Sequence, residues 1–266
     1  MSYFTVQKLC AGYAGAPIIR NLSFSISSGK LLGILGANGS GKTTLLKALC
    51  GIHSHDGTCS LEGTLLDDMS ARQIARLVSY IPQRSGISID ISVLDVVLMG
   101  FNPQLHLLEY PNDSMRRQAI RALETVGLLS RAHDNYLHLS EGQKQLCILA
   151  RTLVTDSRLL LLDEPESALD FRFRYRMLQT IRSWLQNASR CAIVTLHDPT
   201  LALNYCDELL LLKDGQSIGL LHPGEDSCER MSALLSVIYG SVTVTACCDK
   251  TGKQHLVMLK EEDASV

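Results

Sequence analysis

The sequence predicts an α/β protein built on a mixed sheet with antiparallel edge strands and carrying an inserted helical subdomain. A strand, a glycine-rich loop and a helix follow one another between residues 31 and 49. The runs 158–162 and 191–196 are largely apolar, as buried parallel strands are. Between about residues 92 and 155, apolar residues recur at helical spacing instead. We therefore expect a sheet-based core at 1–84 and 156–223, a helical subdomain at 85–155, and a C-terminal helix and hairpin at 224–266.

The composition of the 266-residue chain limits its class. Lys and Arg number 25 against 27 Asp and Glu, so the charge balance does not indicate nucleic acid as a partner. The nine cysteines are scattered, and the adjacent Cys247 and Cys248 match no zinc signature. We expect reduced thiols in a cytoplasmic protein. The start lacks a signal-peptide pattern, and no apolar run approaches the roughly 18 residues of a membrane span. Any role at a membrane should therefore act through a partner.

The first 26 residues predict short antiparallel strands. Residues 4–26 alternate in polarity, and Gly12, Gly15 and Pro17 mark turns. Tyr13 stands in the first of these turns. A tyrosine there is usually a surface residue, but its aromatic face would also serve as a platform for a base.

The glycine-rich loop fits the pattern of a phosphate-binding loop, G-x-x-x-x-G-K-[ST]. Gly36, Gly39 and Gly41 let the backbone turn so that its N–H groups point at an anion, and a helix begins near Lys42. Lys42 supplies a charge for the outer phosphates, and Thr43 supplies a hydroxyl for Mg²⁺. A chance glycine loop would lack the strand before it and the helix after it. We therefore expect this protein to bind a nucleoside triphosphate.

The segment that follows predicts short alternating elements. They are a left-handed helix cap at Gly51, a strand–turn–strand unit at 57–66, a helix at 69–77 with Ser70 as N-cap, and a strand at 77–81 that stops before Gln83.

The inserted segment contains a second candidate site. Residues 101–113 predict a loop, and Ser140 with Gln143 three residues later predicts a capping box at the start of a helix. A capping box alone explains the start of a helix and requires no further function of these residues. A helix start is also a place where backbone N–H groups can receive a phosphate.

Two apolar strands end in polar residues that suit phosphate chemistry. The run 158–162 leads into Asp163 and Glu164, at the edge where open α/β sheets bind ligands. Beside a phosphate loop, Asp163 suits a water-mediated Mg²⁺ contact, and Glu164 could orient or deprotonate a water. Without the loop, two solvated acids would be the simpler interpretation. The run 191–196 ends in His197, although a lone histidine is more often structural than catalytic.

The last part of the chain predicts a helix to about residue 205, a strand at 208–213 and a turn at 214–215. A helix should follow from about residue 232, and then a hairpin with strands near 242–247 and 254–259.

Taken together, these motifs resemble the signature set of ATP-binding-cassette (ABC) ATPases across nearly the whole chain. The matching positions are the phosphate loop, Gln83 after a strand, Leu139-Ser-Glu-Gly-Gln143, the acidic pair Asp163-Glu164, Ser167-Ala-Leu-Asp170 and His197. The resemblance implies a phosphate-loop ATPase core that uses ATP and Mg²⁺.

The resemblance also implies a role for each matching residue. Glu164 would be the general base, His197 the γ-phosphate sensor and Lys42 the phosphate-stabilising cation. Thr43, Gln83 and Asp163 would serve the metal. The implied nucleotide contacts are Tyr13, Gly36, Asn38, Gly39, Ser40, Gly41, Lys42, Thr43, Thr44, Gln83, Ser140, Gly142, Gln143 and Asp170.

Partners follow from the same resemblance. Members of the family work as head-to-tail dimers, so a second ATPase subunit, most simply a second copy, is implied. Transmembrane permease subunits and, indirectly, an extracytoplasmic binding protein are implied too, with the chain at the cytoplasmic face of the membrane. Residues 92–103 and 237–240 are similar to importers of iron-siderophores, haem and cobalamin. Importers of metal ions or molybdate, a soluble ABC ATPase and a different phosphate-loop enzyme such as a small-molecule kinase are the alternatives.

Two residues depart from the family pattern. Glu141 stands where glycine is usual, and Glu166 where threonine is common. A carboxylate in the first turn favours the helix dipole, but it would also repel a phosphate nearby. We therefore expect Glu141 to affect whether ATP is hydrolysed at the full rate.

Overall fold

A computed structural model describes residues 2–13, 16–83, 86–106, 108–166, 170–186 and 189–261. It divides into two compact units, Met1–Asp67 with Ile193–Val266, and Asp68–Ala192. The finer division at residues 84, 155 and 223 stays a prediction. The predicted turn residue Gly15 and the stretch 167–169 lie outside the described residues.

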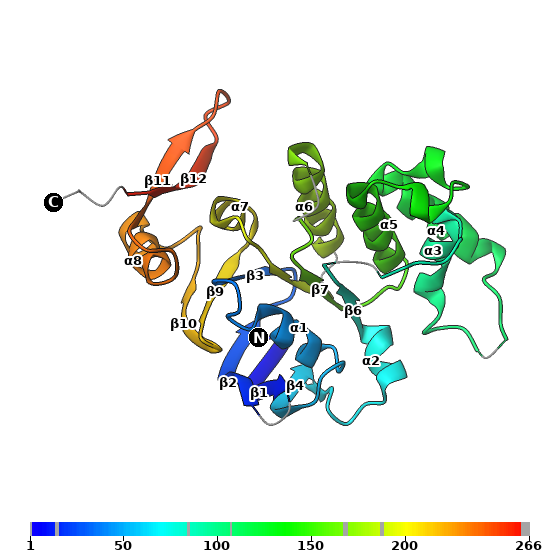
Figure 1. Cartoon of the computed structure of the whole chain (residues 1–266), viewed down its shortest axis with the longest axis horizontal. Helices are drawn as coiled ribbons and strands as arrows, with labels where there is room; N and C mark the ends of the chain where they lie inside the picture. Colours follow the sequence, from blue (N-terminus) through cyan, green and yellow to red (C-terminus); the bar gives the residue numbers. More distant parts are fainter. Residues whose placement is uncertain are drawn as a thin grey trace. The chain divides into compact units, whose positions relative to one another are not determined.

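The first unit contains an antiparallel sheet in the order β2-β1-β4-β5 (Figure 1). Its strands are β1 (Phe4–Tyr13), β2 (Ala16–Ile26), β4 (His55–Leu61) and β5 (Thr64–Leu65). Phe4, Val6 and Leu9 of β1 are buried, whereas the residues between them are more exposed. One face of the sheet thus packs on the core, which confirms the antiparallel strands predicted for residues 4–26.

The first unit also contains β3 (Leu31–Leu35), β9 (Glu208–Lys213) and β10 (Gln216–Leu221), in the order β10-β9-β3. Strand β3 is parallel to β9 and completely buried, as its apolar sequence predicts. The helices of this part are α1 (Lys42–Leu49) and α7 (Pro199–Tyr205). Strand β10 is absent from the sequence prediction. The turn before it has Asp214 and Gly215 at positive φ, the type I′ pattern that pairs two strands in a hairpin.

The second unit contains the parallel pair β6 (Val78–Ile81) and β7 (Leu159–Asp163). The chain passes from this unit into the first within β8 (Cys191–Thr195). Helix α2 (Ala71–Leu77) begins at Ser70, whose side chain forms a capping box with Gln73. Ser70 was predicted as the N-cap, and the structure confirms it.

Most helices of the second unit belong to the segment predicted to be helical. Helices α3 (Val93–Leu98), α4 (Asp113–Val126) and α5 (Glu141–Leu153) pack against one another (Figure 1). Within the described ranges, three short 3₁₀ turns join them, at Met99–Phe101, Leu129–Arg131 and Tyr136–His138. Gly100 is required in the first turn, because a Cβ there would collide with the Arg151 carbonyl of α5.

Helix α6 (Phe171–Leu185) is missing from the sequence prediction. The sequence nevertheless contains the usual signals of a helix at this position. Asp170 caps it by accepting a hydrogen bond from the Phe173 amide, and Met177, Leu178 and Ile181 form a buried stripe at helical spacing. The arginines at 172, 174 and 176 interrupt the apolar pattern in the first turns and hide it.

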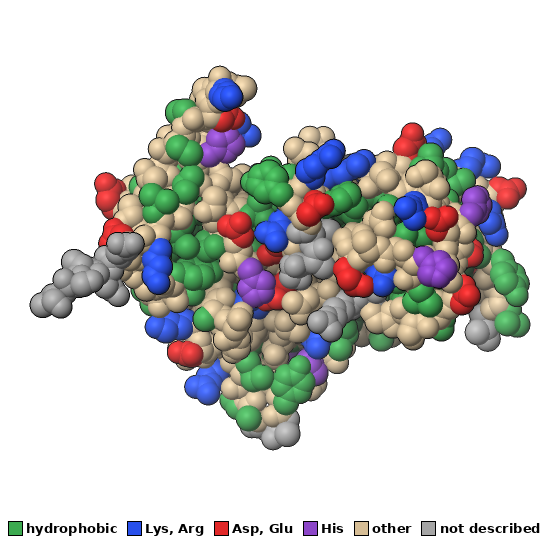
Figure 2. Space-filling model, turned by 45° about the horizontal axis from the view of Figure 1, so that its top comes forward, with side chains coloured by type: hydrophobic (Ala, Val, Ile, Leu, Met, Phe, Trp, Pro, Cys, Tyr) green, Lys and Arg blue, Asp and Glu red, His purple; other side chains and the backbone are tan. Residues whose placement is uncertain are grey.

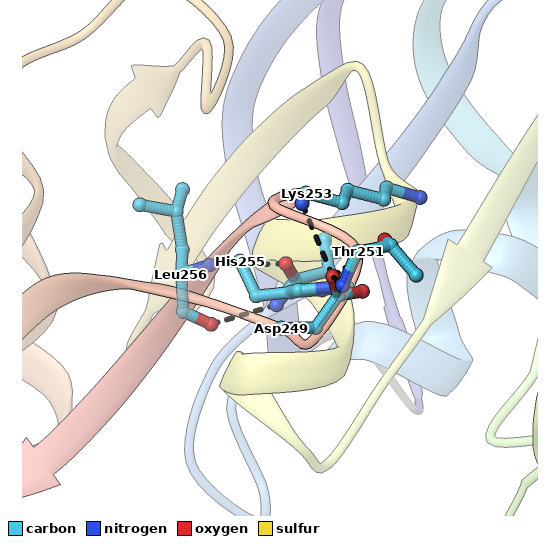
Figure 3. A network of polar contacts seen from close by, with 6 residues as sticks. Asp249, Thr251, Lys253, His255 and Leu256 are labelled. Atoms are coloured by element: carbon cyan, nitrogen blue, oxygen red, sulfur yellow. Dashed lines mark hydrogen bonds and ion pairs between the residues drawn. The ribbon is translucent and has the colours of Figure 1, made fainter.

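The C-terminal part of the first unit consists of α8 (Cys228–Tyr239) and the hairpin β11 (Val242–Cys248) and β12 (Gln254–Lys260). The hairpin was predicted. Helix α8 begins four residues before the predicted start at residue 232, because Ser227 caps it. At the hairpin turn, Asp249 accepts hydrogen bonds from Thr251, Lys253 and His255 (Figure 3). Those from Thr251 and His255 hold the pKa of Asp249 well below its usual value.

Side chains from two helices bond to backbone groups on both strands of this hairpin. On β12, Asn204 of α7 donates to the Leu256 carbonyl at 2.7 Å and accepts from the Leu256 amide at 3.0 Å. On β11, Ser232 and Ser236 of α8 accept from the amides of Val244 and Val242. An isolated two-stranded hairpin is only marginally stable in water, so these bonds hold it in place.

The surface carries both signs of charge and no helix suited to a membrane. Acidic and basic side chains are interspersed on the face seen in Figure 2. Within the described part of the chain, no helix combines the length and apolar character that a membrane crossing needs. All nine cysteines lie in described ranges, and no disulfide joins them. Burial raises the pKa of Cys59 and of Cys147 to about 12, so both are protonated thiols at neutral pH.

We predict that Asn204→Leu releases the hairpin from α7. The variant leaves the Leu256 amide and carbonyl without their partner, which should cost about 1–3 kcal/mol locally. Hydrogen exchange followed by mass spectrometry should therefore show faster exchange across β12. Thr251→Val, which alters only the hairpin turn, is the matched control. Equal protection of β12 in Asn204→Leu and in the parent would contradict this role of Asn204.

Candidate active site

The phosphate loop of the first unit has the backbone that its glycines require. It joins β3 to α1, and Gly39 and Gly41 have φ of 80° and 101°. Gly36 lies so close to the Leu212 carbonyl and the Ser40 hydroxyl that a side chain would not fit. The Gly215 amide bonds to the Ser40 carbonyl at 3.2 Å and fixes the far side of the loop. The loop is therefore rigidly curved.

Lys42 is folded back over this loop. Its ammonium donates to the Gly36 carbonyl at 2.9 Å and to the Ala37 carbonyl at 3.3 Å, and only 5% of the residue is exposed. A buried ammonium is stable only with such partners. The lysine charge thus lies at the loop itself, where an anionic ligand would meet it.

The start of α1 fits a phosphate group. Gly41 is its N-cap, and no side chain caps the helix. Within the described residues, the buried hydroxyl of Ser40 has no hydrogen-bond partner. Both features leave donors for an anion. The loop also borders a pocket of about 130 Å³, which is lined by Ala37, Asn38, Gly39 and Ser40 together with Lys213, Asp214 and Ile238. Thr43 is half-buried in the first turn of α1, and Thr44 beside it is buried.

Two further predicted residues belong to the same unit as the loop. Tyr13 ends β1, is 46% exposed and contacts His53. His197 is exposed and follows β8. The amide of Leu196 donates to the Ile34 carbonyl, so the end of β8 lies beside β3. His197 and the phosphate loop therefore extend from the carboxyl ends of neighbouring strands.

The acidic pair belongs to the second unit, at the end of β7. Asp163 is 2% exposed, and the Tyr80 hydroxyl donates to its Oδ2 at 3.1 Å. Glu164 has a φ of 48°, a left-handed conformation that is costly for a residue with a side chain. The Gln83 amide donates to Glu164 Oε2 at 3.0 Å. Backbone strain and a side-chain hydrogen bond thus fix the direction of this carboxylate.

Gln83 is held in turn by α5. The Gln145 side chain, which is 6% exposed, donates to the Gln83 carbonyl. Strands β6 and β7 run in parallel with Ile81 opposite Leu162, so Gln83 and the acidic pair follow the ends of adjacent strands. Tyr80 and Gln145 are not among the predicted site residues. Only their spacing from Gln83 and Gln143 could have indicated them.

The motif at residues 139–143 begins α5 as predicted. The Gln143 amide donates to Ser140 Oγ, and the Ser140 amide donates to Gln143 Oε1, which confirms the capping box. Gly142 lies in the first turn. Glu141 accepts from the Lys144 ammonium at 2.7 Å, while 67% of its side chain is exposed. The carboxylate that departs from the family pattern therefore has a cationic partner one turn away.

The remaining predicted residues also lie in the second unit. Asp170 serves as the N-cap of α6, and Glu166 is 2% exposed. The motif residues 167–169 lie outside the described part of the chain. The structure thus brings Gln83 to Glu164 in one unit, and the phosphate loop to the strand that carries His197 in the other.

Comparison with known proteins agrees with this geometry. A family profile described as "ABC transporter" matches residues 19–167. A "Hemin import ATP-binding protein" of Bordetella pertussis is 38% identical over 229 residues, which cover 82% of this chain and 86% of the relative. A "Probable iron chelatin transport ATP-binding protein" of Helicobacter pylori is 35% identical over 211 residues, covering 79% of this chain and 83% of the relative.

Solved structures extend the agreement to the fold. A transporter assigned provisionally to the metal-chelate type of ABC transporter, in an inward-facing conformation, superimposes with a TM-score of 0.82 at 26% identity, covering 98% of this chain and 99% of that one. A nucleotide-free ATP-binding cassette gives a TM-score of 0.77 at 21% identity over 89% of this chain and 96% of that one. The profile, the relatives and the fold agree, and this chain belongs to the ABC transporter family as one of its ATP-binding ATPase subunits.

Proposed function

We propose that this protein binds MgATP at its phosphate loop and hydrolyses it to energise a membrane importer. The observation that carries the proposal is the buried Lys42 ammonium over a rigid loop, at the uncapped start of α1. Together they supply a cation and backbone donors for the β- and γ-phosphates. Tyr13 would stack on the adenine.

Each remaining group has a proposed part in the hydrolysis. Thr43 and Asp163 would hold Mg²⁺, with Gln83 as a further contact. The ion supplies positive charge that neutralises the phosphates. Glu164 would accept a proton from the attacking water, since Gln83 and the strained backbone fix its direction. His197 would contact the γ-phosphate from the end of β8.

We predict that Glu164→Gln binds ATP with little change but loses hydrolysis by about 10²–10⁴, because the amide has no basic oxygen to accept the proton. Phosphate release and nucleotide titration on the same preparation would measure both properties. The variant should also accumulate as a dimer with bound ATP in size-exclusion chromatography. Glu166→Gln, which changes a neighbouring carboxylate, serves as the matched control. Turnover of Glu164→Gln near that of the parent would remove Glu164 from the role of base.

The signature motif would act on the ATP of a second subunit. In the proposed head-to-tail homodimer, the start of α5 at Ser140 faces the nucleotide held by the other chain, with Gly142 and Gln143 beside it and Asp170 coupling the two chains. Glu141 would then lie near a γ-phosphate. Its pairing with Lys144 offsets part of that negative charge.

We predict that Glu141→Gly keeps or raises ATP hydrolysis. The change removes a carboxylate near the phosphate and releases the Lys144 ammonium. It costs the helix about 0.3–1 kcal/mol of dipole stabilisation, which is less than a close charge repulsion. Steady-state ATPase rates of Glu141→Gly and of the parent protein would test this prediction. Lys144→Ala is the complementary test. It should lower the rate of ATP hydrolysis in the parent protein, where Glu141 is present, and leave it unchanged in Glu141→Gly. A clear drop in Glu141→Gly with an unchanged melting temperature would contradict this account.

The proposed partners are transmembrane permease subunits, and through them an extracytoplasmic binding protein. The chain would lie peripherally at the cytoplasmic face of the membrane. Gln83 and the helical segment α3–α5 would carry the surface for the permease, because Gln83 links the carboxylate of Glu164 to α5. A soluble ABC ATPase without a permease is the alternative. Co-purification with a polytopic membrane protein after mild detergent extraction would separate the two.

The proposed cargo is an iron chelate, haem or a corrinoid such as cobalamin. The names of the two relatives, for hemin and for iron chelatin, and the resemblance of residues 92–103 and 237–240 support it. Importers of metal ions or molybdate remain the alternative. We predict that deletion of the gene lowers uptake of labelled ferric siderophore, haem or cobalamin and leaves zinc and molybdate uptake unchanged. Loss of only zinc or molybdate uptake would contradict the cargo while leaving the ATPase assignment intact.

A further inference from the structure

We infer that His53 is a positioning residue that orients Tyr13 for the base of the nucleotide. The inference rests on the proposed function, because Tyr13 meets a base only if the chain binds a nucleotide. Neither the sequence motifs nor the family resemblance gave His53 a role. The geometry around Tyr13 assigns it one.

Among the described residues, His53 makes the side-chain hydrogen bond and the ring contact to Tyr13. Tyr13 is the last residue of β1, and nearly half of its surface is exposed, so the phenol ring is only partly packed. The Tyr13 hydroxyl lies 2.7 Å from His53 Nε2, within hydrogen-bonding distance. The ring centroids are 4.5 Å apart and the planes meet at 87°, an edge-to-face pair. Two interactions from one residue therefore set the direction of the ring.

The same contact leaves room for a planar ligand. A perpendicular imidazole covers at most one face of the phenol ring. Because 46% of Tyr13 is exposed, part of the residue remains accessible to a stacking base. A ring that is already fixed loses little rotamer freedom when a base stacks on it.

His53 is itself fixed to the helix that begins at the phosphate loop. The amides of Ile52 and His53 both donate to the Lys47 carbonyl in the last turn of α1, at 2.9 and 3.1 Å. Gly51 permits this return with a φ of 73°. Helix α1 starts at Lys42 and spans eight residues. One short helix thus joins the phosphate-binding end to the residue that holds Tyr13.

The expected consequence is specific to ligands with a base. In His53→Ala the Tyr13 ring must be ordered at each binding event, so we expect the Kd for MgATP to rise about three- to tenfold. Tripolyphosphate has no base, and its Kd should stay as in the parent protein. The turnover rate at saturating ATP should also stay unchanged. His53→Gln, whose amide can reach the position of Nε2, should restore most of the affinity.

The experiment is isothermal titration calorimetry of the full chain with MgATP and with magnesium tripolyphosphate. The variants are His53→Ala, His53→Gln, Tyr13→Phe, Tyr13→Ala and the double variant Tyr13→Phe with His53→Ala. The double variant should bind MgATP no more weakly than His53→Ala alone, because both changes remove the same contact. His55→Ala is the control, since His55 pairs with Asp67 instead. Thermal melting of each variant verifies folding.

Two results would overturn the inference and leave the proposed function standing. One is an unchanged Kd for MgATP in His53→Ala while Tyr13→Ala binds weakly. The other is an equal loss of affinity for MgATP and tripolyphosphate in His53→Ala, since that would place the effect in α1 and the loop. If Tyr13→Ala binds MgATP as the parent does, the base platform itself is wrong, and the inference falls with it.

Discussion

The ammonium of Lys42, buried over its own loop, is the interaction on which the first unit depends. Removing a charge from water is expensive unless polar groups replace the solvent, and here two loop carbonyls do so. Those carbonyls can converge on one side chain only because the glycines turn the backbone around it. Strand β3 before the loop is completely buried, and the turn at Gly215 holds the loop from its other side. The buried strand and the turn therefore support the curved loop that holds this ammonium.

The acidic pair of the second unit is also an energetically costly arrangement that its surroundings hold in place. Here the cost is backbone strain instead of the burial of a charge. A left-handed conformation at Glu164 costs of order 1–3 kcal/mol. Strand β7 before it is entirely buried, and the Tyr80 hydroxyl fixes the adjacent Asp163. Gln83 then fixes the Glu164 side chain itself. The strain is tolerated because β7, Asp163 and the Glu164 side chain are held in this way, and it keeps the carboxylate in one direction.

Sequence alone predicted those parts of the molecule in which local chemistry decides the structure. The glycine loop, the caps at Ser70 and Ser140 and the apolar strands β7 and β8 each depend on residues close in the chain, so the pattern contains the answer. Helix α6 was missed because arginines mask its apolar stripe, and β10 because only the pairing with β9 makes it a strand. The contacts of Tyr80 and Gln145 join residues more than 60 positions apart, which no local pattern records.

Segments without regular backbone pairing are held in this protein by side chains that bond to the main chain. Asp207 accepts a hydrogen bond from the Leu31 amide at the start of β3, and Gln145 donates one to the Gln83 carbonyl. Asn204 bonds to the Leu256 carbonyl of β12, as a neighbouring strand would. Buried backbone groups must be satisfied, and a side chain can do this where a strand or helix has ended. Such a bond depends on one residue, whereas a sheet ladder depends on many. A single substitution at Asp207, Gln145 or Asn204 can therefore move one of these segments while the buried core stays intact.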